Sequence, residues 1–124
     1  MDLTARIIHE IDTSPLNRGL RGIDWVRNPL NVAITEGDDL ALFDYVQPGV
    51  YEGHFFFQSR GKEAVAAAKS ITARMLETAH LIIGRVPLIN RKAGVIARSA
   101  GYHYAGIGQT AHGPVFIYLA GKIQ

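Results

Sequence analysis

The chain has 124 residues, of which 48% are hydrophobic and 19% charged, and its formal net charge is only +2. This composition excludes a mainly disordered chain, and the length favours a single domain over residues 1–124. Because the sequence contains no cysteine, disulfides, thiolate nucleophiles and cysteine metal sites are excluded. The first residues lack the apolar stretch of a secretory signal, and no apolar run is long enough to span a bilayer.

Residues 1–30 form a helical N-terminal segment in this prediction. Apolar side chains at helical spacing predict a helix over residues 3–11, which Pro15 is expected to end. Residues 16–28 also contain apolar residues at helical spacing, but Gly19 and Gly22 weaken the pattern. A second helix in that stretch therefore stays open.

From residue 31 the hydrophobic period changes to that of strands, which begins the predicted core over residues 31–120. Three short β-type segments follow, around residues 32–34, 40–43 and 50–57, and turn sequences separate them. The segments predict an antiparallel meander.

The second half of the core alternates helices and strands. An alanine-rich stretch predicts a helix over residues 62–79, and the continuous apolar run 81–86 is typical of a buried parallel strand. Asn90 is suited to cap a helix over 91–100, and residues 102–120 predict a final hairpin. We therefore expect a single-domain α/β fold, whose mixed and mostly antiparallel sheet has one parallel strand pair flanked by helices.

Two helix starts carry cations at the end of the helix that favours anions. Arg60 and Lys62 lie at the start of the long helix, and Arg91 and Lys92 repeat the arrangement thirty residues later. Because both helices should follow the carboxyl ends of neighbouring strands, the two basic starts are expected at one edge of the sheet. Free backbone N–H groups and Gly61 in the first loop would suit a phosphate group.

Four motifs stand out in the predicted core: YEGHFFFQSRGKEA at 51–64, GRVP at 84–87, NRKA at 90–93 and AGY at 100–102. Together they resemble the GNAT superfamily of acyl-CoA-dependent N-acyltransferases. The resemblance covers about residues 31–120, and the chain looks similar to the short acyltransferase-like proteins encoded by tailed bacteriophages. The sequence departs from the family pattern at Glu63 in the loop and at Ala97, where many relatives have a tyrosine.

The resemblance implies a site for acetyl-CoA where the strands at 50–57 and 81–86 splay apart. A main-chain N–H near Phe56 or Phe57 would polarise the acyl carbonyl, and Asn90 would contact the pantetheine arm. The loop residues would hold the pyrophosphate through backbone N–H groups, with charge from Arg60 and Lys62. The full predicted set is Phe56, Phe57, Gln58, Ser59, Arg60, Gly61, Lys62, Glu63, Ala64, Asn90 and Lys92.

Few residues are suited to the acid and base steps. Glu52 and His54 lie two apart on one predicted strand, so they share a face, and either could deprotonate an attacking amine. Tyr102, with Tyr104 and Tyr118 as alternatives, could donate a proton to the leaving thiolate. A structural pair at 52 and 54 and packing roles for the tyrosines are the alternatives.

The leading hypothesis is an acetyl-CoA-dependent N-acetyltransferase acting on a primary amine in the cytoplasm. A catalytically silent structural component, for example of a bacteriophage virion or a homo-oligomer, is the second hypothesis, and a CoA-binding regulator is the third. The five histidines show no metal-ligand spacing, so no metal is expected. The scattered arginines and the absence of a transmembrane segment argue against nucleic-acid and membrane partners.

Overall fold

The computed structural model describes residues 2–14 and 19–121, which form four helices and six strands. In chain order they are α1 (Leu3–Thr13), α2 (Gly22–Arg27), β1 (Val32–Glu36), β2 (Asp39–Gln47), β3 (Val50–Phe56), α3 (Gly61–Met75), β4 (Leu81–Pro87), α4 (Arg91–Ser99), β5 (His103–Thr110) and β6 (Gly113–Gly121).

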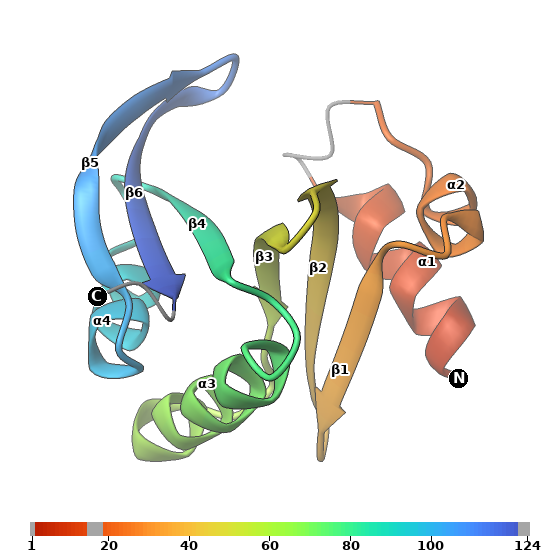
Figure 1. Cartoon of the computed structure of the whole chain (residues 1–124), viewed down its shortest axis with the longest axis horizontal. Helices are drawn as coiled ribbons and strands as arrows, with labels where there is room; N and C mark the ends of the chain where they lie inside the picture. The colour runs from red at the N-terminus through yellow and green to blue at the C-terminus, as the bar shows by residue number, and fades with distance from the viewer. Residues whose placement is uncertain (1, 15–18, 122–124) are drawn as a thin grey trace.

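The six strands form one sheet in the order β1-β2-β3-β4-β6-β5. All neighbours are antiparallel except β3 and β4, which are parallel and pair only over Val50–Glu52 and Leu81–Ile83. Beyond Glu52 the two strands separate, and Figure 1 shows the resulting two arms: β1–β3 with α1 and α2, and β4–β6 with α4. The expected fold class, with its single parallel and splayed pair, is confirmed.

One face of the sheet packs against α3 and α4. The alanines of α3 allow the helix to lie close to the strands, and Ala64, Ala68 and Ile71 are fully buried there. Ile71 belongs to the same hydrophobic cluster as Phe43 and Ile82 of the sheet. The predicted apolar stripe of this helix is therefore its core-facing side.

The opposite face of β1–β3 packs against α1 and α2. Ile7 and Ile11 of α1 and Trp25 of α2 cover Leu40 and Leu42 of β2. Gly22 is needed where the two helices touch, because a Cβ there would lie 2.6 Å from the Cα of Ile8. This small layer forms one wall of the cleft described below.

Most predicted boundaries shift by one or a few residues, and the long helix changes at its end. The helix predicted over 62–79 ends at Met75, because the N–H groups of His80 and Leu81 donate to the carbonyl of Gly49 and draw the chain into β4 beside β3. The second helix, which the sequence left undecided within residues 16–28, is present as the short α2. Pro15, expected to end the first helix, lies outside the described residues. None of the described helices is long and apolar enough to cross a membrane.

Candidate functional site

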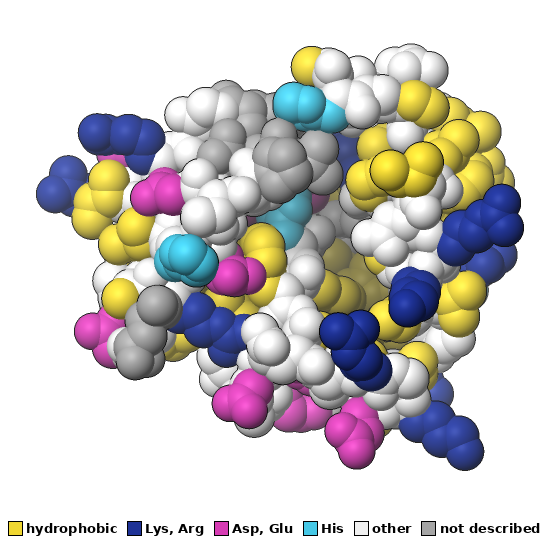
Figure 2. Space-filling view, turned by 180° about the vertical axis from the view of Figure 1, so that it is seen from behind, with side chains coloured by type: hydrophobic (Ala, Val, Ile, Leu, Met, Phe, Trp, Pro, Cys, Tyr) yellow, Lys and Arg dark blue, Asp and Glu magenta, His cyan; other side chains and the backbone are white. Residues whose placement is uncertain are grey.

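A cleft of about 1600 Å³ opens where β3 and β4 separate. Residues from both arms and from the starts of α3 and α4 line it. Figure 2 shows the hollow from behind, with hydrophobic side chains inside it and Lys and Arg side chains on one rim. The cleft therefore combines an apolar interior with a basic margin.

A buried carboxylate holds the loop that joins β3 to α3. Asp39, at 4% exposure, accepts hydrogen bonds from the backbone N–H groups of Gln58 at 2.7 Å and Ser59 at 2.9 Å, and also from the Ser59 hydroxyl. Burial alone raises the pKa of Asp39, but these bonds and the charge of Arg6 outweigh it and hold that pKa below its usual value. Asp39 thus fixes the first half of the loop.

The second half of the loop leaves its N–H groups available. Among the described residues, the backbone N–H groups of Gly61, Lys62 and Glu63 have no hydrogen-bond acceptor, while that of Ala64 donates to the carbonyl of Arg60. Gly61 has a φ of 57°, a conformation that favours glycine at this helix start. With Arg60 and Lys62 exposed beside them, these N–H groups could bind an anion.

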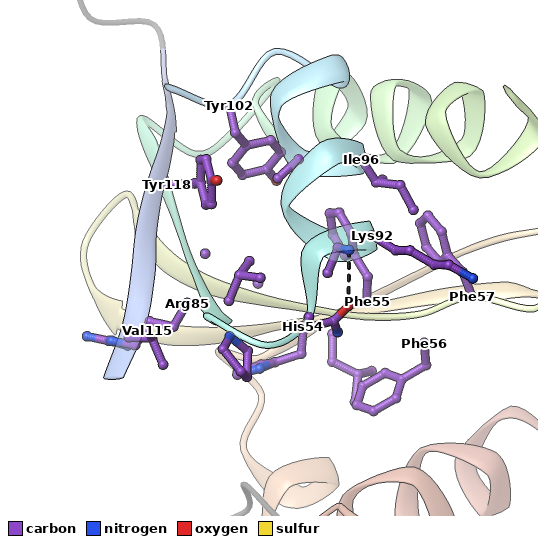
Figure 3. Close-up of a pocket in the computed structure, with 18 of the residues that line it drawn as sticks. His54, Phe55, Phe56, Phe57, Arg85, Lys92, Ile96, Tyr102, Val115 and Tyr118 are labelled. Atoms are coloured by element: carbon purple, nitrogen blue, oxygen red, sulfur yellow. Dashed lines mark hydrogen bonds between the residues drawn. The ribbon is translucent and has the colours of Figure 1, made fainter. Parts of the chain in front are cut away.

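The second basic helix start faces the same cleft. The Asn90 side chain caps α4 by accepting from the Ala93 N–H at 3.1 Å, as the sequence predicts. Figure 3 shows Lys92 reaching from α4 toward Phe57, the residue that follows β3. The two predicted basic starts therefore both line one cleft.

The other half of the cleft holds a chain of paired polar side chains, which we call the acceptor-side network: Trp25, Asp44, Glu52, His54 and Arg85. The Trp25 indole N–H donates to Asp44 at 2.5 Å, and the His54 Nε2 lies 2.8 Å from the other Asp44 oxygen. Glu52 lies 3.7 Å from His54 and forms an ion pair with Arg85. The network joins α2, β2, β3 and β4.

The carboxylates around His54 raise its pKa. Burial lowers the pKa of His54, but the hydrogen bond and charge of Asp44, with the charge of Glu52, outweigh it, so that pKa lies above its ordinary value. Glu52 and His54, predicted to share a face, do so. Because Glu52 is paired with Arg85, His54 is the better suited of the two to accept a proton.

The three predicted tyrosines differ in what their hydroxyls contact. The Tyr102 hydroxyl shares a hydrogen bond of 3.0 Å with Thr72, and burial raises the pKa of Tyr102 to about 12. Within the described residues the Tyr118 hydroxyl has no hydrogen-bond partner, although the side chain is 3% exposed and lines the cleft. Tyr104 does not line this cleft.

The Tyr118 hydroxyl fits a space that α4 leaves open. A Cβ on Gly94 would lie 3.3 Å from that hydroxyl, and Ala97 one turn later is also small and lines the cleft. Figure 3 shows Tyr118 and Tyr102 together near α4, whereas His54 and Arg85 lie on the other side of the strands. The Tyr118 hydroxyl, which comes from β6, therefore lies beside the part of α4 that contains position 97.

The remaining predicted residues divide between the cleft and the core. Phe56 and Phe57 line the cleft, where Phe57 stacks on Phe55 with ring centroids 5.0 Å apart. Ala64 has no exposed surface and is one of the buried core residues. Because β3 loses its β4 partner beyond Glu52, every second N–H of its last residues faces the opening.

Sequence reasoning missed four residues of the site: Trp25, Asp39, Asp44 and Arg85. Asp44 lies directly opposite Glu52 in the β2–β3 pairing, a register that the sequence alone does not provide. Asp39 lies in the turn sequence EGDD between the first two predicted strands, where acidic residues are usually exposed, yet it is the one buried charged side chain among the described residues. No group of three or more metal-ligating side chains occurs among the residues that the structure describes.

No protein-family model matches the sequence, and no curated protein matches it significantly. Solved structures do match its fold. The aminoglycoside acetyltransferase AAC(6')-Ib, in complex with paromomycin and acetyl-CoA, is similar with a TM-score of 0.60 and 15% identity, over 68% of this chain and 58% of that one.

Two ribosomal-protein acetyltransferases are also similar. The ribosomal-protein-S5-alanine acetyltransferase from Vibrio fischeri has a TM-score of 0.58 and 10% identity, over 67% of this chain and 53% of that one. RimL, in complex with coenzyme A, has a TM-score of 0.57 and 12% identity, over 67% and 54%. The chain spans less than two thirds of these structures, and at such identities the likeness shows the GNAT fold alone.

Proposed function

We propose that this protein is an acetyl-CoA-dependent N-acetyltransferase that acts on a primary amine. The observation that carries the proposal is a single cleft with unpaired N–H groups and cations at one end and a carboxylate-held histidine at the other. The solved neighbours bound to acetyl-CoA or coenzyme A support the choice of donor.

The loop and the two helix starts would hold the phosphate groups of CoA. The N–H groups of Gly61, Lys62 and Glu63 are oriented by a helix start that Asp39 anchors from behind. Arg60, Lys62 and Lys92 add positive charge. Glu63 adds its charge at this helix start, but its backbone N–H is available to an anion.

His54 would accept the proton of the attacking amine. Its Nε2 is held by Asp44, which Trp25 holds in turn, so the ring is positioned and the imidazolium that forms is stabilised. The amine nitrogen forms a bond to the acetyl carbonyl carbon while the carbon–sulfur bond breaks. An N–H of β3 that faces the splay would donate to the carbonyl oxygen as negative charge develops there.

Tyr118 would supply the proton that the leaving thiolate takes up. Its hydroxyl is unpaired among the described residues and lines the cleft, whereas the Tyr102 hydroxyl is bound by Thr72 and burial raises the pKa of Tyr102 to about 12. Tyr102, the proton donor expected from the sequence, is better suited to hold α3 against β5. The products are the N-acetylated amine and free CoA.

Calorimetric titration with acetyl-CoA tests the proposal, followed by detection of released thiol with a panel of amines. We expect binding that weakens when Arg60→Glu and Lys62→Glu are combined, and weakens with added salt. Absence of binding at about 1 mM ligand, the range of the weakest specific affinities, contradicts the proposal. Binding without turnover on any amine would instead favour the third hypothesis, a CoA-binding regulator.

The virion role rests on the resemblance to phage-encoded proteins, and the neighbours reported above add nothing to it. Co-sedimentation with purified particles at a fixed stoichiometry would be its test. The proposed cytoplasmic location and self-association likewise await fractionation and measurement of molecular mass in solution.

A further inference from the structure

The acceptor-side network has no carboxylate oxygen without a partner. Asp44 uses one oxygen for the Trp25 indole and the other for His54. Glu52 uses one oxygen for Arg85, and its second oxygen faces His54 at 3.7 Å. A positively charged substrate group that approaches either carboxylate would therefore share it with a cation or a donor that already contacts it within the protein.

These two carboxylates are the whole acidic content of the cleft lining. Among the described residues, the acidic side chains on its wall are Asp44 and Glu52, whereas the cations are Arg60, Lys62, Arg85, Arg91 and Lys92. The residues outside the description, 1, 15–18 and 122–124, include no Asp or Glu in the sequence. Among the described residues of the lining, cations therefore outnumber carboxylates by five to two, which is unfavourable for a substrate with several ammonium groups.

The cations divide into two groups by position. Four of them lie at the starts of α3 and α4, where the phosphate groups of CoA would be bound. Arg85 lies apart from them, on β4 beside Glu52. The network itself is therefore close to neutral, with one net negative charge when His54 is neutral and none when it is protonated.

The walls around the network are apolar. Leu20 and Leu42 line this half of the cleft with the rings of Trp25 and Phe56. Leu42 and Trp25 are buried, and Leu20 is exposed at the mouth. Such a surface favours a hydrocarbon or aromatic group over a hydrated polar one.

We infer that the acceptor is an amine with a single positive charge on an apolar or aromatic carrier, and that polycationic amines are discriminated against. This inference rests on the proposed function. The amine of such a substrate loses its first proton to solvent and then approaches His54, which accepts the proton released as the nitrogen attacks, while the carrier lies against Trp25 and Phe56. Additional ammonium groups would meet Arg85 or break the pair between Arg85 and Glu52.

The test compares one aromatic monoamine, 2-phenylethylamine, with two polycations, spermidine and kanamycin. Calorimetry measures the affinity of each amine for the protein saturated with free CoA, so that the result does not depend on turnover. We expect 2-phenylethylamine to bind at least about tenfold more tightly than either polycation. Equal or tighter binding of spermidine or kanamycin overturns the inference.

Thiol release with acetyl-CoA and the same amines separates this inference from the proposed function. If the affinities rank as expected and no amine is acetylated, the activity fails while the selectivity stands. If amines are acetylated and the polycations have the higher kcat/KM, the selectivity fails while the activity stands.

An arginine substitution tests the cause of the selectivity. Arg85→Gln leaves Glu52 without its cation, so we expect the affinity ratio of spermidine to 2-phenylethylamine to rise about tenfold. Arg74→Gln is the matched control. It removes one positive charge in the same way, but Arg74 lies on α3 and does not line the cleft. An unchanged ratio in Arg85→Gln, with binding retained, contradicts the role of the Arg85–Glu52 pair.

Discussion

The two halves of the cleft are built in different ways. The donor half consists of backbone N–H groups at the start of α3 and exposed cations on α3 and α4, all within short segments of the chain. The acceptor half consists of five side chains from α2, β2, β3 and β4, each held by another. Backbone N–H groups suit a ligand whose phosphate groups are always the same. A network of side chains can change with the substrate, because substitutions alter its shape and charge.

Under the proposed function, this difference also separates what each half would do in catalysis. The donor half supplies a fixed array of positive partial charges, whose strength depends on loop geometry and hardly on pH. The acceptor half contains the titrating group, because Asp44 and Glu52 raise the pKa of His54. Substitutions in the donor half should therefore change the affinity for CoA, and those in the acceptor half should change the rate and its pH dependence.

The largest effect is expected from His54→Ala. Loss of the proton acceptor should lower kcat/KM by roughly 10² to 10⁴, while the affinity for acetyl-CoA changes little. In the unsubstituted protein, kcat/KM should fall as pH decreases through a pKa above the ordinary 6.5, because protonated His54 cannot accept a proton. Steady-state rates measured as a function of pH test the loss of kcat/KM and its pH dependence. His9→Ala is the control, because His9 is exposed on α1.

A tyrosine pair gives the next effect. Tyr118→Phe should lower kcat by roughly tenfold to 10², because the thiolate would have to take its proton from water. Tyr102→Phe should leave kcat nearly unchanged and cost about 1 kcal/mol of stability through its lost bond to Thr72. Thiol-release rates and thermal unfolding of both variants test this assignment. A larger loss of kcat in Tyr102→Phe than in Tyr118→Phe would mean that Tyr102 is the proton donor.

Asp39→Asn should affect the donor half indirectly, because Asp39 holds the loop but does not line the cleft. The charge-assisted bonds to Gln58 and Ser59 would weaken, so we expect about 1.5–3 kcal/mol less stability and a several-fold higher KM for acetyl-CoA, with kcat largely kept. Asp38→Asn is the matched control, since Asp38 is the exposed neighbour. A change in kcat without a change in KM would contradict the positioning role.

The same residue predicts a pH dependence of stability. The folded-state pKa of Asp39 lies below its ordinary value of about 3.9, so the unfolded chain binds the proton more readily. The stability that Asp39 contributes is present above that ordinary value and is lost as pH falls below it through the folded-state pKa. Urea unfolding of the protein and of Asp39→Asn between pH 6 and pH 2, a range of about four units, should converge at the acid end.

The smallest effect is expected from a single cation of the donor half. Lys92→Ala should weaken the binding of acetyl-CoA roughly twofold to fivefold at low ionic strength, and the difference should shrink with added salt. Calorimetric titration at two salt concentrations measures it. Lys69→Ala, which removes an exposed charge of α3 away from the cleft, should leave the affinity unchanged.

The sequence by itself determined the order of elements apart from α2, and the two basic helix starts of the donor half apart from their support by Asp39. The alanine stripe of α3, the cap at Asn90 and the two basic helix starts are local patterns, because spacing of a few residues decides them. The parallel strand pair follows from the helix between two apolar runs. These features needed no knowledge of contacts between distant segments.

Only the tertiary structure decided the acceptor half. Asp44 becomes a partner of His54 through the pairing of β2 with β3, and Trp25 reaches Asp44 because α2 packs over that face of the sheet. The choice between Tyr102 and Tyr118 depends on Thr72 and Gly94, which lie on two different helices. Register and packing place such side chains together, and neither is encoded in any short stretch of sequence.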